Sequence, residues 1–136
     1  MRGERQPWVG MPQAPQSQLD RLFGLGRITL PMLSAGRQFR GDYLLQQSTG
    51  RGRDSLAREP GAVSGPLEVT AAARRVRYVM AALGVSGMRL LVGVTVEDRS
   101  PAEVARELGM DSDWGAPTLR LALGEVVKVY GVVEAA

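Results

Sequence analysis

A group of polar, aromatic and cationic side chains near the carboxyl end of the chain has the composition of a nucleic-acid contact surface. Hydroxyl, indole and cationic groups are among those that proteins use to contact phosphates and the edges of bases. The chemistry that they predict is recognition of double-stranded DNA rather than the making or breaking of bonds. The candidate contact residues are Ser112, Trp114, Thr118, Arg120 and Lys128.

A second group of candidate contacts consists of arginines farther upstream, which carry the charge needed to hold phosphates. The net charge is +3, and it is uneven: residues 1–66 carry nine arginines against five acids, whereas residues 67–136 carry eight cations against nine acids. Arginine-rich arms bind phosphate backbones without sequence preference. Solubility of a tail explains the arm equally well, and a solvated helix face is the favoured explanation for the later cluster. The arginines are Arg51, Arg53, Arg74, Arg75 and Arg77.

Residue types that support catalysis are missing. The chain has no cysteine and no histidine, which removes thiolate chemistry, the commonest metal ligand and the commonest general base. The run Asp111-Ser112-Asp113 opens like a calcium loop, but its twelfth position is Ala122 instead of a glutamate. Gly24-Leu25-Gly26 lacks the third glycine of a dinucleotide-binding loop. We expect no catalytic residue, no metal, no cofactor and no enzymatic activity.

The candidate contacts need a scaffold, and residues 100–131 have the plan of a helix-turn-helix. Ser100 suits an N-cap, Pro101 suits the first helical position, and Glu103 completes a capping box. Gly109 is a suitable residue to end this first helix. Its buried side is expected to carry Val104, Ala105 and Leu108.

The second helix is predicted to begin near Ala116 or Pro117 and to end at Gly131. A glycine in its middle, Gly124, predicts a close contact with another helix. In the turn, Asp113 is expected to cap the second helix and Trp114 to fill a hydrophobic gap beside it. Residues at three- and four-residue steps predict its buried face, which comprises Leu119, Ala122, Leu123, Val126 and Tyr130.

Two more helices are predicted directly before this unit. Residues 67–83 carry an apolar stripe at helical spacing. Residues 88–98 are ambiguous, because their apolar run is strand-like in composition but unbroken rather than alternating; a short buried helix is the favoured interpretation. Gly84 and Gly87 separate the two segments. The stripe of the first consists of Val69, Ala72, Val76, Val79, Met80 and Leu83.

The N-terminal half gives weaker signals. Residues 1–18 are rich in proline, glutamine and glycine and are predicted to be disordered or extended. Residues 19–24 are predicted to form one or two helical turns. Residues 34–47 predict a helix that two glycines make weak in isolation. Residues 49–66 are predicted to be a linker.

Together these elements predict an all-α fold class. Residues 1–18 are the expected disordered tail, and residues 19–66 hold short helices and an Arg/Gly-containing linker, so the N-terminal segment is largely irregular. Residues 67–136 form the expected small helical domain with its C-terminal helix-turn-helix. We expect no apolar run that approaches the ~18–20 residues that span a bilayer, and no secretory signal is recognisable. We therefore expect a cytoplasmic protein without a membrane contact.

Five stretches of the sequence carry a resemblance to a known family. They are Glu107–Met110, Leu119–Val127, Tyr130–Gly131, and, upstream, 35–43 and 71–77. With these stretches the chain resembles a helix-turn-helix family of unknown function found in alphaproteobacteria, which itself resembles region 4 of sigma factors. The resemblance covers most of the chain. It implies a helical fold with a long final helix ending in Tyr-Gly, and a role on nucleic acid.

The chain departs from that family in the turn. Family members tend to carry basic residues there and early in the second helix, where this sequence has Asp111, Asp113 and Ala116. Acids repel phosphates, and base readout normally uses Arg, Lys, Asn or Gln. Binding would then need the arginine arm, a dimer or a larger partner such as RNA polymerase.

Three functions fit the sequence. We favour a DNA-binding transcriptional regulator that acts on double-stranded DNA, alone or with RNA polymerase or another protein. The first alternative is a protein-interaction module that keeps the scaffold and docks a partner on Trp114, Val127 and Val129. The second is a phage-type small terminase subunit, which recognises DNA for packaging and forms a ring-shaped homo-oligomer. The acidic turn favours the interaction module, and the arginine arm favours the regulator.

Overall fold

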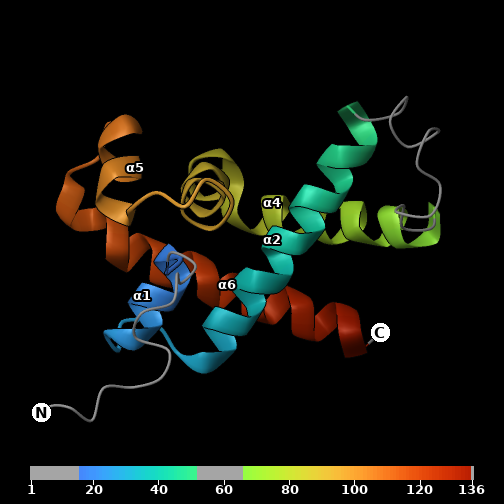
Figure 1. Cartoon of the computed structure of the whole chain (residues 1–136), viewed down its shortest axis with the longest axis horizontal. Coiled ribbons are helices and arrows are strands. Elements are labelled where there is room, and N and C mark those ends of the chain that lie inside the picture. Colours follow the sequence, from blue (N-terminus) through green and yellow to red (C-terminus); the bar gives the residue numbers. More distant parts are fainter. Residues whose placement is uncertain (1–15, 52–65, 136) are drawn as a thin grey trace, which may run out of the picture.

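Every regular element in the described part of the chain is a helix. The computed structural model describes residues 16–51 and 66–135 (Figure 1). The predicted all-α class is therefore confirmed. The elements in chain order are α1 (Gln18–Gly24), α2 (Leu30–Arg51), α4 (Pro66–Thr95), α5 (Pro101–Glu107), the 3-10 helix η2 (Ser112–Trp114) and α6 (Gly115–Ala135).

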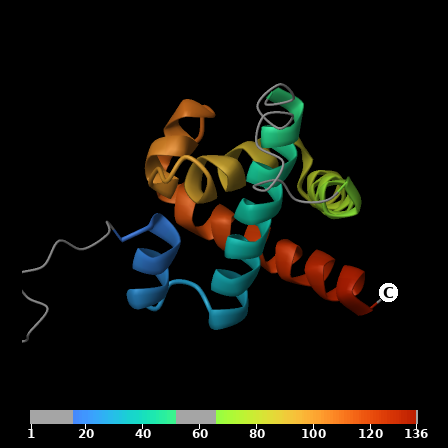
Figure 2. The same ribbon diagram turned by 45° about the vertical axis from the view of Figure 1, so that its right-hand side comes forward.

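Three long helices enclose the core. α2, α4 and α6 cross one another at the centre of the molecule, while α1 and α5 lie toward the end where α6 begins (Figures 1 and 2). Each long helix contributes an apolar face, and burial of these faces is the main source of stability in a bundle of this kind. The largest fully buried side chains are Phe39, Val79, Leu90, Leu91, Val94, Leu119, Leu123 and Val126.

α4 joins the two predicted helices 67–83 and 88–98 into one kinked element. The kink is at Gly84, whose φ of 76° and ψ of 179° are essentially restricted to glycine. The helical prediction for the ambiguous second segment is confirmed as far as Thr95. Met80, predicted to lie on the buried stripe, is instead about half-exposed. The change of direction at Gly84 lets the two halves of α4 pack against different parts of α2 and α6.

The length and apolar composition of α4 also exceed what the sequence analysis expected. Leu67–Thr95 is long and apolar enough, by those two criteria alone, to cross a membrane, and 39% of its most apolar window is buried inside the fold. The expectation that no segment approaches that length is therefore wrong for this helix. A helix that supplies the core of a small bundle has the same composition.

The N-terminal helices are longer than predicted. α2 extends beyond residues 34–47 at both ends. It can begin at Leu30 because Pro31 is accepted in a first helical turn, and Thr29 Oγ1 accepts a hydrogen bond of 3.3 Å from the Met32 N–H. The helical turns predicted for 19–24 are confirmed as α1, which Ser17 caps. Of the predicted linker, residues 49–51 and Pro66 are helical. Its remaining residues, 52–65, lie outside the described part, as do residues 1–15 of the predicted tail.

Candidate nucleic-acid interface

The first helix of the predicted helix-turn-helix is α5, and its local signals act as expected. Ser100 Oγ accepts a hydrogen bond of 3.2 Å from the Glu103 N–H, and Pro101 occupies the first helical position. Gly109, with a φ of 82°, takes the left-handed conformation just after the helix. Val104 and Ala105 are buried, and Leu108 is partly buried against the core. This helix is thus confirmed.

The two helices of the unit meet at Gly115. A Cβ added to this glycine would lie 2.3 Å from the Pro101 carbonyl oxygen, so only glycine allows α6 to begin this close to α5. The close contact predicted for Gly124 is wrong, since nothing lies within 4 Å of a Cβ built there. α6 also begins one residue before the predicted start and continues past Gly131 to Ala135. A single glycine costs a helix only about 1 kcal/mol, so Gly131 does not end it.

The buried face of α6 is the one predicted: its five residues are all buried. On the opposite face, Trp114, Leu121 and Lys128 follow one another at seven-residue steps, with partly buried Thr118 between the first two. Trp114 is 61% exposed and Leu121 is 75% exposed. The prediction that Trp114 fills a hydrophobic gap is therefore wrong. The candidate contacts Trp114, Thr118 and Lys128 share one outward face.

The charged groups of the turn and of α6 differ in their partners. Asp111 caps η2, since its Oδ1 accepts a hydrogen bond of 2.9 Å from the Asp113 N–H. The Asp113 side chain makes no hydrogen bond with another described residue, so the predicted cap of α6 is wrong. Lys128 Nζ lies 3.2 Å from Glu125 Oε2 in an exposed pair, which is of small energetic value. Arg120 is exposed and has no hydrogen bond or ion pair with another described residue. Arg120 is therefore the cation on α6 that is free to contact a ligand.

The upstream arginines are not gathered around the turn. Arg75 Nε and Nη2 donate to Asp42 at 2.6 and 3.0 Å, and Tyr130 donates to the same carboxylate. The hydrogen bond with Asp42 raises the pKa of Arg75. This contact places Arg75 beside the distal half of α6, on a face that holds the bundle together. We leave it out of the proposed interface.

The other arginines of this second group give no further contact site. Arg74 and Arg77 are exposed on the first half of α4. That half lies beside the carboxyl end of α6, far along the helix from the turn (Figure 1). The side chain of Arg51, although its backbone ends α2, and all of Arg53 lie outside the described residues.

Two arginines that the sequence analysis did not select do lie next to the turn. Arg21 of α1 and Arg27, just after α1, line a hollow of about 380 Å³ together with Ser112, Asp113 and Ala116. Both arginine side chains are exposed, and neither is ion-paired within the described residues. No local sequence signal connects residue 21 to residue 113. The only indication in the sequence was the excess of arginines over acids in the N-terminal half.

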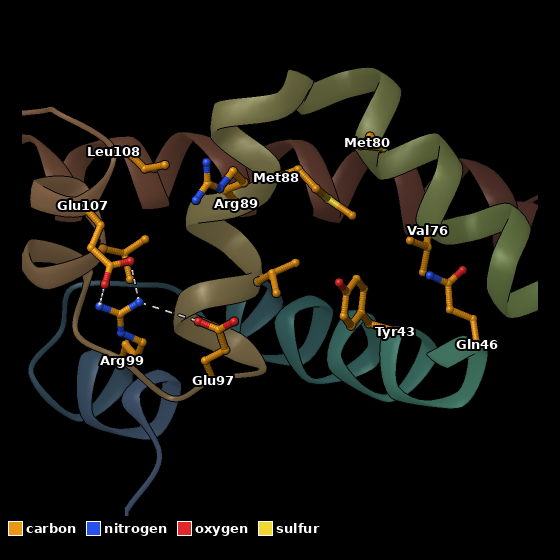
Figure 3. A pocket seen from close by; sticks show the side chains of 12 residues that line it. Tyr43, Gln46, Val76, Met80, Met88, Arg89, Glu97, Arg99, Glu107 and Leu108 are labelled. Atoms are coloured by element: carbon orange, nitrogen blue, oxygen red, sulfur yellow. Dashed lines mark hydrogen bonds and ion pairs between the residues drawn. The ribbon is translucent and has the colours of Figure 1, made fainter. Parts of the chain in front are cut away.

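A second hollow, of about 520 Å³, lies between α2, α4 and α5 and contains none of the predicted contact residues (Figure 3). At one end, Arg99 donates to Glu107, with Nη1 2.7 Å from Oε1, and pairs with Glu97 and Glu103 at 3.7 and 3.2 Å. The hydrogen bond from Arg99 lowers the pKa of Glu107. Three carboxylates thus converge on the one guanidinium group of Arg99, and the cluster fixes the loop before α5 against that helix.

No metal site is formed within the described residues, where no three His, Cys, Asp or Glu side chains come together to hold an ion. No protein family, characterised protein or solved structure matches this chain. The resemblance to the alphaproteobacterial helix-turn-helix family thus stays a prediction that rests on the residues quoted for it.

Proposed function

We propose that this protein is a transcriptional regulator that binds double-stranded DNA with the α5–η2–α6 unit and acts together with RNA polymerase. The observation that carries the proposal is the outward face of α6. It begins directly after a turn fixed by Gly115 against Pro101 and presents Thr118, while Arg120, which has no ion pair with another described residue, is exposed on the other flank of the helix. The second helix of a helix-turn-helix inserts its first turns into the major groove.

Each of these groups has a use in base readout. The Arg120 guanidinium suits the O6 and N7 atoms of guanine, and the Thr118 hydroxyl can bond to several base edges. Trp114 and Leu121 offer apolar surface of the kind that contacts thymine methyl groups. The negative charges of Asp111 and Asp113 weaken the attraction to phosphates, so binding of DNA by the isolated chain is weak. A partner already on DNA, such as RNA polymerase, would raise the local concentration of the duplex.

The test of this proposal is selection of preferred sites from a random duplex library, followed by affinity measurements with Arg120→Ala. This variant should bind the selected site about 5- to 100-fold more weakly and lose preference at one base pair, as expected for a broken base contact. Arg89→Ala is the matched control, because Arg89 is an exposed arginine on the other hollow. Equal losses for both variants would reject α6 as the reading helix.

Exposed Trp114 and Leu121 favour one second candidate, a protein-interaction module on the same scaffold. Large apolar side chains exposed at 61% and 75% on one helix face are typical of protein contact sites. The probe is purified RNA polymerase, and the reporter is the emission of Trp114 in a Trp8→Phe variant. A blue shift on mixing, together with no DNA binding at low salt, would support the interaction module over the regulator.

A further inference from the structure

We infer that Arg21 and Arg27 form a clamp for one phosphate group of the DNA backbone, beside the reading helix. This inference rests on the proposed function, because its ligand is the same duplex. Both arginines line the hollow between α1 and the turn, and the hollow also includes Ala116 of α6. Arg120 follows Ala116 by four residues, and therefore lies about 6 Å farther along the same edge of the helix. The clamp and the reading residue thus share one side of α6.

The charge of this hollow favours an anion. Asp113 is the single acid among its lining residues, against two arginines. The nearby carboxylate of Asp20 is paired with Arg37. Asp98, whose Oδ1 accepts the Gln18 N–H at 2.8 Å, lines a different hollow. The guanidinium groups of Arg21 and Arg27 have no counter-ion among residues 16–51 and 66–135, and a phosphate would supply one.

Several contacts hold α1 in a fixed position relative to the helix-turn-helix. The Gln18–Asp98 hydrogen bond ties the start of α1 to the loop that leads into α5. Leu19 is buried and packs so closely on Gly36 of α2 that a Cβ there would lie 2.8 Å from its Cδ1. A phosphate contact made from α1 would therefore set the register of α6 in the groove, which is the usual role of backbone contacts.

The experiment measures the salt dependence of binding to a fluorescent random-sequence duplex by anisotropy. For wild type and for the double variant Arg21→Gln/Arg27→Gln, the slope of log K against log salt concentration is compared. Loss of the one clamped phosphate should flatten the slope by about 0.9 and weaken low-salt binding several-fold. The double variant Arg21→Lys/Arg27→Lys keeps the charge and should keep the slope. Because lysine keeps the charge, this variant still reports on the phosphate contact if the glutamine substitutions disturb α1.

Two controls separate a local effect from a change of net charge. Arg89→Gln removes a charge from the other hollow, which shares no lining residue with this one, and should leave the slope unchanged. Asp113→Asn removes the opposing charge and should tighten binding about two- to fivefold. If wild type binds DNA and the glutamine variant has the same slope, the clamp is rejected while the proposed function stands. If wild type fails to bind at low salt, both are overturned.

Discussion

The Tyr130 hydroxyl donates a hydrogen bond of 2.6 Å to Oδ2 of Asp42, and so connects the distal half of α6 to α2. Arg75 of α4 donates to both oxygens of the same carboxylate. One aspartate therefore joins the three long helices on the far side from the turn. Since α6 is a single helix, this junction also fixes the direction in which its outward face points.

The Asp42 junction should be needed for stability. Removing its different members should lower the free energy of unfolding by different amounts. Tyr130→Phe removes one hydrogen bond and should lower the free energy of unfolding by about 1 kcal/mol. Asp42→Ala leaves both the Tyr130 hydroxyl and a mostly buried Arg75 without a partner, and should cost about 3 kcal/mol. Urea denaturation followed by circular dichroism measures both. Equal losses for the two variants would contradict a shared role for the carboxylate.

Alkaline pH should weaken the same junction. Burial, with the hydrogen bond to Asp42, raises the pKa of Tyr130 above its ordinary value of 10.0. A raised pKa in the folded state means that the stabilisation is complete below pH 10 and is lost as the pH rises above it. Between pH 9 and 11 the melting temperature of wild type should therefore fall more steeply than that of Tyr130→Phe. An equal fall in melting temperature for the two proteins would contradict the raised pKa of Tyr130.

A pair of glycine substitutions in α6 tests the packing of the turn. Gly115→Ala places a methyl group against the Pro101 carbonyl and should destabilise the protein by roughly 3 kcal/mol. Gly124→Ala meets nothing within 4 Å and should stabilise it by about 0.5–1 kcal/mol. Thermal melting of the two variants beside wild type is sufficient. A neutral Gly115→Ala would show that α5 and α6 are not in this contact.

Acid should loosen the loop before α5. The hydrogen bond from Arg99 holds the pKa of Glu107 below its ordinary value of 4.5. With a depressed folded-state pKa, the stabilisation is present above pH 4.5 and disappears as the pH falls through the lower value. Glu107→Gln should thus lose stability at neutral pH and show a shallower acid limb than wild type. Unfolding curves between pH 2 and 7 measure this, and identical acid limbs would refute it.

Local signals in the sequence were sufficient where a structure depends on neighbouring residues. Ser100, Pro101 and Gly109 defined α5 because caps and left-handed ends act within a few positions. The buried face of α6 followed from its spacing alone. The same reasoning went wrong at Gly124, because a glycine in a helix does not reveal whether another chain segment lies against it. It went wrong at Gly131, because one glycine costs a helix too little to end it.

Contacts between distant residues were not predictable from spacing. Arg75 was selected as a candidate phosphate contact. Nothing in the sequence indicates that it pairs instead with Asp42, 33 residues away. Arg21 was not selected because its proximity to Asp113 depends on how α1 packs in the fold. In the candidate interface, the scaffold was thus predicted well, whereas the partners of its charged groups required coordinates.

The most direct test of the central proposal is the anisotropy of a labelled random-sequence duplex titrated with the wild-type protein at about 50 mM and then about 200 mM salt. A protein that contacts phosphates should bind at the lower salt and lose affinity at the higher, by about threefold for each phosphate contacted. That result would support the regulator. No binding at the lower salt would contradict it.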